Sequence, residues 1–160
     1  MEDKHLNDTY CNYILDVADN GFNEIIVNSP ILENYLREKY PDFKYILSTT
    51  KCERNVDKIN KACDNYDLVV IDYRDNKKEE FLLNLNQKDK IEILINAYCY
   101  PNCPNRETHY KIISQNTLDF AKKISLGCGI MNNSFFQSLT YTSTVLTNTE
   151  LYNKYINMGF

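Results

Sequence analysis

The sequence predicts an α/β protein whose parallel sheet is built from repeated strand and helix units. Four short apolar runs, near residues 24–28, 45–48, 68–72 and 91–96, begin 21 to 23 residues apart. Segments of helical pattern separate them, as expected for successive βα units. Each run ends on a polar residue, so we expect a row of polar side chains at the carboxyl edge of the sheet.

The helices between these runs carry their own start and stop signals. Thr9 suits the cap of a first helix, and Gly21 suits its end. Ser29-Pro30 is a capping residue followed by a proline at the first helical position, and the helix that it opens should run to about Lys39. The apolar residues of the first helix recur at helical spacing and should form its packed side: Tyr10, Tyr13, Ile14 and Val17.

Further elements follow in the same way along the chain. We expect helices from about Asn55, over 78–85, from Asn105 to about Ser114, and from a capping box at Thr147 and Glu150. Residues 118–124 resemble a further helical piece, and residues 141–146 have strand composition.

The chain length limits the architecture. A (β/α)₈ barrel of the TIM type typically needs about 250 residues, and this chain of 160 residues forms a single α/β domain with four or five βα units. We therefore expect an open sheet, a half-barrel that dimerises, or a partial or truncated TIM-like barrel. A partial barrel has a free edge strand, which predicts a homo-oligomer or a partner chain that completes it.

Composition excludes several classes of protein. The net charge of −4 gives no bulk attraction to nucleic acid, so an RNA partner is unsupported. No segment is apolar and long enough for a signal peptide or a membrane span, which predicts a cytoplasmic protein without a membrane partner. In that compartment the cysteines should be reduced or bound to metal rather than paired in disulfides. Cys11 and Cys63 read as ordinary packing residues.

The most distinctive stretch is Ile91 to Arg106, where a buried strand opens into a loop with two thiols. Cys99 and Cys103 have the spacing of metal ligands, and the prolines beside them stiffen the loop. Cys128, between two glycines, is a candidate third ligand, and either Cys52 or His109 is a candidate fourth. The alternative is that these are reduced structural cysteines.

Polar residues at the predicted strand ends form a second set of candidates. Asn28, Ser48, Asp72 and Asn96 end the four runs, and Arg106 follows the cysteine loop, so they could face a substrate. For any single one, a helix cap or loop hydrogen bond is the alternative. Asp72 and Asp75 are candidate acids or bases, but the sequence has no Ser/His/Asp order, HExxH or P-loop motif. No catalytic residue is assigned.

Three stretches resemble proteins related to the collagenase-like peptidase family: Asn28-Ser-Pro, Ser48-Thr-Thr-Lys-Cys52, and above all Ile93 to Tyr110. That resemblance implies a TIM-barrel-type domain. It also implies a 4Fe–4S cluster, because members that act in ubiquinone and in tRNA or rRNA hydroxylation hold one through four cysteines. Two of these are commonly spaced CxxxC, which Cys99 and Cys103 match. The longer arginine-, glycine- and cysteine-rich signature of the core members is absent here.

The sequence therefore predicts an iron–sulfur protein of a hydroxylation or modification system, with a hydroxylation-type or peptidase-like activity left open. No visible nucleophile supports a peptidase. The alternative is a non-catalytic structural or binding module in which the cysteines are reduced or hold zinc.

Overall fold

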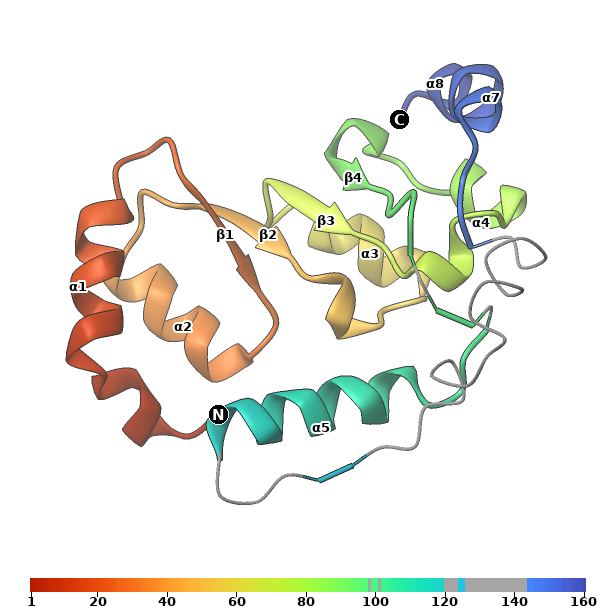
Figure 1. Cartoon of the computed structure of the whole chain (residues 1–160). Coiled ribbons are helices and arrows are strands. Elements are labelled where there is room, and N and C mark those ends of the chain that lie inside the picture. Colours follow the sequence, from red (N-terminus) through yellow and green to blue (C-terminus); the bar gives the residue numbers. More distant parts are fainter. Residues whose placement is uncertain (98, 101, 120–123, 126–143) are drawn as a thin grey trace.

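The structure is a computed structural model of the chain, and it describes residues 1–97, 99–100, 102–119, 124–125 and 144–160. Its four strands form one sheet in the order β1-β2-β3-β4 (Figure 1). They are β1 (Glu24–Val27), β2 (Lys44–Leu47), β3 (Leu68–Val70) and β4 (Ile91–Glu92). Every pair of neighbours is parallel, which confirms the predicted α/β fold and its sequential strand order. These strands neither close a barrel nor exclude one, so the TIM-like barrel stays a prediction.

The fourth strand is shorter than the sequence predicts. It ends at Glu92, whereas the prediction extended it to Asn96. The reason is a second pairing partner: Asn96 forms an antiparallel bridge with Val145, and the Leu146 N–H donates to the Ile95 carbonyl at 2.8 Å. The prediction that Asn96 closes the fourth strand is therefore wrong, and the predicted strand near 141–146 contributes this bridge through its described part.

Each of the first three strands leads into a helix, as the βα repeat predicts. These helices are α2 (Pro30–Lys39), α3 (Val56–Ala62) and α4 (Glu79–Leu83). Ser29 occupies the N-cap of α2, and the Asn55 side chain caps α3 by accepting the Lys58 N–H at 3.0 Å. The other described helical segments are η1 (Asp3–Asn7), α1 (Thr9–Ala18), η2 (Thr49–Lys51), η3 (Tyr73–Asp75), η4 (Lys88–Lys90), α5 (Arg106–Leu118), α7 (Asn148–Glu150), η6 (Leu151–Tyr155) and α8 (Ile156–Met158).

The core lies between the sheet and α2, α3 and α4. Strand register places Val27, Leu47, Val69 and Ile91 on one face of the sheet, and all four are buried. Side chains alternate between the two faces of a strand, so Ile26 points to the opposite face. There 64% of Ile26 is exposed. The face away from the helices is therefore uncovered at β1.

The first helix faces the opposite way from the prediction. Its apolar residues at helical spacing are all exposed: Tyr10, Tyr13, Ile14 and Val17. The helix instead packs through Leu15 and Ala18 against the buried cluster that contains Val27. Cys11 is exposed, so its assignment as a packing residue is wrong, whereas the fully buried Cys63 confirms the assignment made for it. Asp8, rather than Thr9, caps this helix by accepting the Cys11 N–H at 2.8 Å.

The C-terminal helical segments are held by polar contacts, to the residues between η3 and α4, as well as by apolar ones. Thr147 and Glu150 form the predicted capping box. The Tyr155 hydroxyl donates to the carbonyl of Asn76 at 2.7 Å, and Lys77 pairs with Glu150 at 2.9 Å. Within the described parts of the chain, no helix has both the length and the apolar character needed to cross a lipid bilayer.

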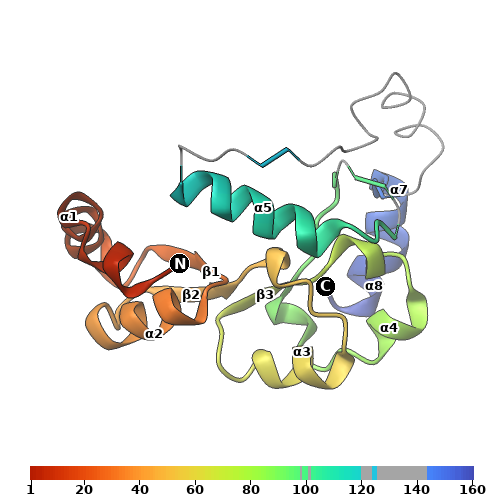
Figure 2. The same ribbon diagram turned by 90° about the horizontal axis from the view of Figure 1, so that it is seen from below.

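Helix α5 sets the position of the site. It runs past the carboxyl ends of the strands in Figure 1, and Figure 2 shows it across the sheet from α2 and α3. It begins at Arg106 and ends at Leu118, four residues later than the predicted end at Ser114, because no residue in this stretch breaks a helix. The helical piece predicted for 118–124 lies largely outside the described residues.

Candidate functional site at the carboxyl edge of the sheet

The carboxyl edge of the sheet collects three of the predicted polar residues. Asn28 directly follows β1, Ser48 directly follows β2, and Asp72 follows β3 after one residue. Because the strands are parallel, these residues lie along one edge, where open α/β sheets bind ligands. Helix α5 passes this edge, and its first residue, Arg106, reaches back to the end of β3.

A buried ion-pair network lies at the centre of this edge. Asp72 accepts hydrogen bonds from the Arg74 guanidinium at 2.9 and 2.8 Å and from Arg106 Nε at 3.0 Å. The side chains of Arg74 and Arg106 are only 7% and 5% exposed. Arg106 also donates from Nη2 to Thr49 Oγ1 at 3.1 Å, and the Thr49 hydroxyl donates to the carbonyl of Ile71 at 3.0 Å. The network therefore ties α5 to the ends of β2 and β3.

The charges of this edge do not balance. Asp72 is shared by two guanidinium groups, and the neighbouring Asp75 pairs with Arg54 at 2.6 Å and Lys78 at 2.7 Å. Burial alone would raise the pKa of Asp72, but the hydrogen bonds and charges of its arginine partners outweigh burial and lower that pKa below its usual value. Both carboxylates are thus ionised at neutral pH and are still outnumbered by cations. Arg54 and Lys78 are partly exposed, so the buried excess is confined to Asp72, where two buried guanidinium groups share one carboxylate. That local excess favours an anion beside Arg74 and Arg106.

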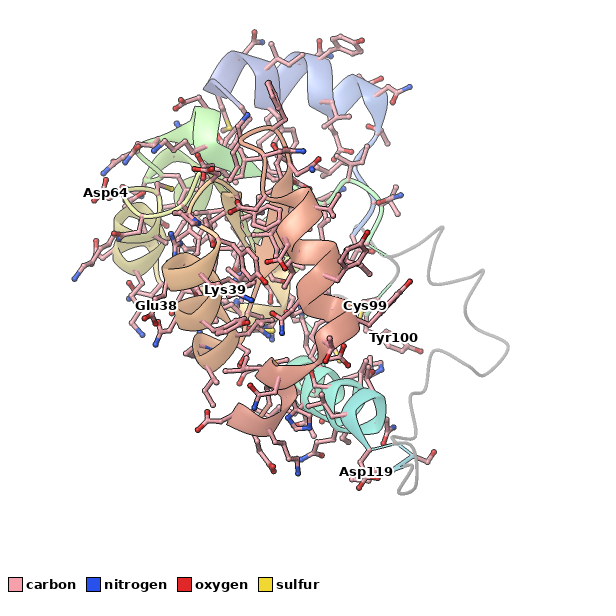
Figure 3. All side chains as sticks on the ribbon, turned by 90° about the vertical axis from the view of Figure 1, so that its left-hand side faces the viewer. Glu38, Lys39, Asp64, Cys99, Tyr100 and Asp119 are labelled. Atoms are coloured by element: carbon pink, nitrogen blue, oxygen red, sulfur yellow. The ribbon has the colours of Figure 1, made fainter. Side chains whose placement is uncertain are left out.

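The cysteine loop is anchored to the same network. The Tyr73 hydroxyl donates to the carbonyl of Tyr100 at 2.7 Å, and Arg74 Nη1 donates to the carbonyl of Cys103 at 3.2 Å. Two turn hydrogen bonds, Cys99 N–H to Ala97 and Cys103 N–H to Tyr100, shape the loop itself. Figure 3 shows Cys99 and Tyr100 next to each other and well away from Asp64, which lies just beyond the end of α3.

Cys99 opens into a small cavity beside α5. The cavity has a volume of about 250 Å³, and its lining includes Cys99, Arg106, His109 and Tyr110. The Arg106 guanidinium lies 4.3 Å from the centre of the Tyr73 ring and 4.8 Å from that of Tyr110, which fixes its position between two aromatic faces. The cavity therefore presents a thiol, an imidazole and a positioned cation to the same space.

Burial shifts the pKa of two thiols in this region. Burial raises the pKa of Cys99, and a hydrogen bond with Tyr73 offsets this only in part. Burial also raises the pKa of Cys52, and the negative charge of Asp72 adds to the effect. Neutral thiols are weak nucleophiles. As attacking groups, Cys52 and Cys99 would need activation by a bound metal or substrate.

The structure brings some of the predicted metal ligands together and separates others. Cys99 and His109 line the same cavity, and Cys103 is on the same loop. Cys52 is buried beside Asp72 and is not among the described residues that line this cavity. Among the described residues no three His, Cys, Asp or Glu side chains are grouped closely enough to hold a metal ion. Cys128 lies outside the described residues, and the four-ligand site stays a prediction.

Comparison with known proteins gives no match to a family model, to a curated protein or to a solved structure.

The remaining candidates have different roles. Ser48 caps η2 by accepting the Thr50 N–H at 3.2 Å, which is the local role that the sequence left open. Asn96 is exposed at the bridge with Val145, whereas Asn28 lines a second cavity of about 340 Å³ together with Lys51 and Lys111. Sequence reasoning did not single out Thr49 or Lys111. Thr49 stands next to Ser48 at the end of β2, which is a usable signal, but the position of Lys111 depends on the path of α5.

Proposed function

We propose that the carboxyl edge of the sheet holds a metal centre bound through Cys99 and Cys103, most readily an iron–sulfur cluster, with Arg106 and His109 beside the bound group. The observation that carries the proposal is the cavity in which the Cys99 thiol meets a buried, fixed arginine. Cys128, the third ligand predicted from the sequence, would add a thiolate from outside the described residues.

The anchoring of the loop supports this proposal. A metal site needs ligands that are held in place by the groups behind them. Tyr73 and Arg74 hold two carbonyls of the loop, so Cys99 and Cys103 do not depend on the metal for their position. Thiolates on one tight loop are the usual ligands of iron–sulfur clusters.

The charge of the edge supports it as well. A cluster held by cysteine thiolates is anionic, and the arginines that share Asp72 supply the excess positive charge that stabilises an anion. Hydrogen bonds and nearby charges also tune the potential of such a cluster. The same proposal assigns the chain to a hydroxylation or modification system related to collagenase-like peptidases, as the sequence resemblance implies.

The test is the metal content of protein purified without oxygen. We expect about four iron atoms and four sulfides per chain and visible charge-transfer absorption. Cys99→Ser and Cys103→Ser should each remove most of the iron, because each deletes a thiolate ligand. Cys11→Ser is the matched control, since Cys11 is exposed on α1 and lies outside this site. Cys128→Ser should behave like the loop variants if the ligand predicted from the sequence is right.

Two results would overturn the proposal. One is wild-type protein that contains no iron after anaerobic purification and cannot be reconstituted with iron and sulfide. The other is equal loss of iron in Cys11→Ser and Cys99→Ser. A third result is a protein that contains zinc instead of iron and loses the zinc in Cys99→Ser and Cys103→Ser. That result would keep the metal site but assign it a structural role.

A second candidate is a binding module with reduced cysteines and no metal. The apolar lining of the cavity favours it, because Leu94, Ala97 and Ile113 surround Cys99 there and suit an organic ligand. In that case the wild type would contain no metal, and Cys99→Ser and Cys11→Ser would both leave the metal content unchanged. The cavity would then bind an organic ligand only.

A further inference from the structure

A second cavity lies along the same edge, at the ends of β1 and β2. It has a volume of about 340 Å³. Asn28 from the end of β1, Thr50 and Lys51 from η2, and Lys111 and Ser114 from α5 contribute to its wall. Met1, Tyr110 and Leu118 add apolar surface to the lining, and the five side chains named above contribute an amide, two hydroxyls and two ammonium groups. These groups recognise an oxyanion rather than an apolar ligand.

The charge of this cavity is positive. Lys51 and Lys111 line it, and the single carboxylate among its described lining residues is that of Glu107, one helical turn before Lys111 on α5. In the part of the chain that the structure describes, neither lysine forms an ion pair within 4.0 Å. Their charges are therefore available to a ligand, and lysine binds phosphate readily as a point charge.

The turn that carries Thr50 and Lys51 is held in one conformation. The Ser48 hydroxyl lies 2.8 Å from that of Thr50, and Ser48 accepts the Thr50 N–H. Cys52 ends the turn with a φ of 56°, in the left-handed region. Thr49 Oγ1 accepts a hydrogen bond from Arg106. The turn that lines the second cavity is therefore also fixed by the ion-pair network around Asp72. A fixed turn places polar groups for binding without a large loss of conformational entropy.

Tyr110 lies between the two cavities. It belongs to the lining of both, with Cys99, Arg106 and His109 in the first and Lys51 and Lys111 in the second. The two cavities are therefore neighbours along α5, and a small molecule that reaches past Tyr110 would have one end beside the cysteine loop and the other beside the lysines.

We infer that the second cavity binds the phosphate or carboxylate group of a small-molecule substrate whose reacting part lies beside Cys99. This inference rests on the proposed function for the reacting end, whereas the oxyanion site itself depends only on the second cavity. Phosphate and carboxylate share the chemistry of oxygen acceptors with negative charge, and the experiment separates them.

The test is a titration of ¹⁵N-labelled full-length protein with inorganic phosphate and, separately, with acetate, at constant ionic strength. We expect saturable shifts of backbone amide signals in η2 and in the first half of α5. The double variant Lys51→Ala/Lys111→Ala should bind the probe at least about tenfold more weakly, because two charge-assisted contacts are lost. The probe with the tighter saturation identifies the group.

The matched control is Lys58→Ala/Lys61→Ala, which removes the same charge from the exposed side of α3. It should bind phosphate like the wild type. Shifts that do not saturate, or equal weakening in both double variants, would overturn the inference. Iron is measured on the same samples. Saturable phosphate binding without iron would refute the metal centre alone, and iron without phosphate binding would refute the oxyanion site alone.

Discussion

The buried carboxylate at the end of β3 offers the sharpest test of the network. Asp72→Asn keeps the shape of the side chain but removes its negative charge. Arg74 and Arg106 would then share no counterion, and their side chains are only 7% and 5% exposed, so water cannot replace the carboxylate without a rearrangement. The variant therefore leaves two buried cations uncompensated.

The expected loss of stability is large. Removing one partner from a buried ion pair costs about 3–5 kcal/mol. Asp72 accepts three hydrogen bonds from two guanidinium groups, so we expect a loss of about 4 kcal/mol in the free energy of unfolding. A domain of this size is stable by about 5–15 kcal/mol, and Asp72→Asn should thus unfold at a much lower urea concentration.

The assay is urea unfolding at pH 7, followed by far-UV circular dichroism. Asp75→Asn is the matched control, because the Asp75 side chain is 3% exposed but its partners Arg54 and Lys78 are 36% and 51% exposed. These cations regain water when the carboxylate is lost, so the control should cost about 1–2 kcal/mol. Adding Arg106→Met to Asp72→Asn should recover part of the loss by removing one of the two uncompensated charges.

The pH dependence gives an independent check. Burial by itself would raise the pKa of Asp72 from 3.8, but its arginine partners lower it overall. The folded protein therefore binds fewer protons at Asp72 than the unfolded chain, and this stability is present above the unfolded pKa and is lost as the pH falls below about 4. The difference between wild type and Asp72→Asn should shrink in the same range. A variant within about 1 kcal/mol of the wild type at pH 7, or one no worse than Asp75→Asn, would refute this account of the network.

Three further predictions concern the cysteine loop, the apolar core and the uncovered face of β1. Tyr73→Phe removes the hydrogen bond to the Tyr100 carbonyl, so it should cost about 1 kcal/mol in urea unfolding and lower the bound metal; unchanged stability and metal content would contradict the anchoring role. Leu82→Ala, at a fully buried position, should cost about 2–5 kcal/mol, whereas Leu83→Ala, at a neighbour that is 56% exposed, should cost less than about 1 kcal/mol; equal midpoints would contradict this placement of the core. Ile26→Lys places a charge on the uncovered face of β1, so light scattering should show a dimer for the wild type and a monomer for the variant; a monodisperse wild-type monomer would contradict the expected assembly.

Much of the fold could be predicted because its signals are local. The strand runs, the proline after Ser29 and the capping box at Thr147 each depend on a few neighbouring residues, and the structure has all of them. The direction in which α1 faces could not be predicted, since its apolar spacing does not reveal which side meets the sheet. The end of β4 was missed for a related reason, because the bridge from Asn96 to Val145 joins segments far apart in the chain.

The candidate site likewise divides into features that local sequence signals predict and features that depend on long-range contacts. The position of the cysteine loop after the fourth apolar run follows from the sequence, and so does the row of polar strand ends. The pairing of Arg106 with Asp72 does not, because it requires α5 to turn back along the edge. Tyr73 and Arg74 were visible only as residues between two candidate acids, and their contacts to the loop depend on the three-dimensional path of the chain.

Helix α5 is attached to the rest of the protein differently from α3. Its single buried residue is Arg106, at its first position, whereas α3 buries Ile59 in the apolar core. An apolar contact does not respond to protons, but the bond between Arg106 and Asp72 weakens when the carboxylate is neutralised. Amide hydrogen exchange should therefore reveal an opening of α5 at a lower free energy than that of the strands, and acid should lower that free energy further. Access to both cavities would then be linked to proton uptake by Asp72 while the rest of the sheet stays folded.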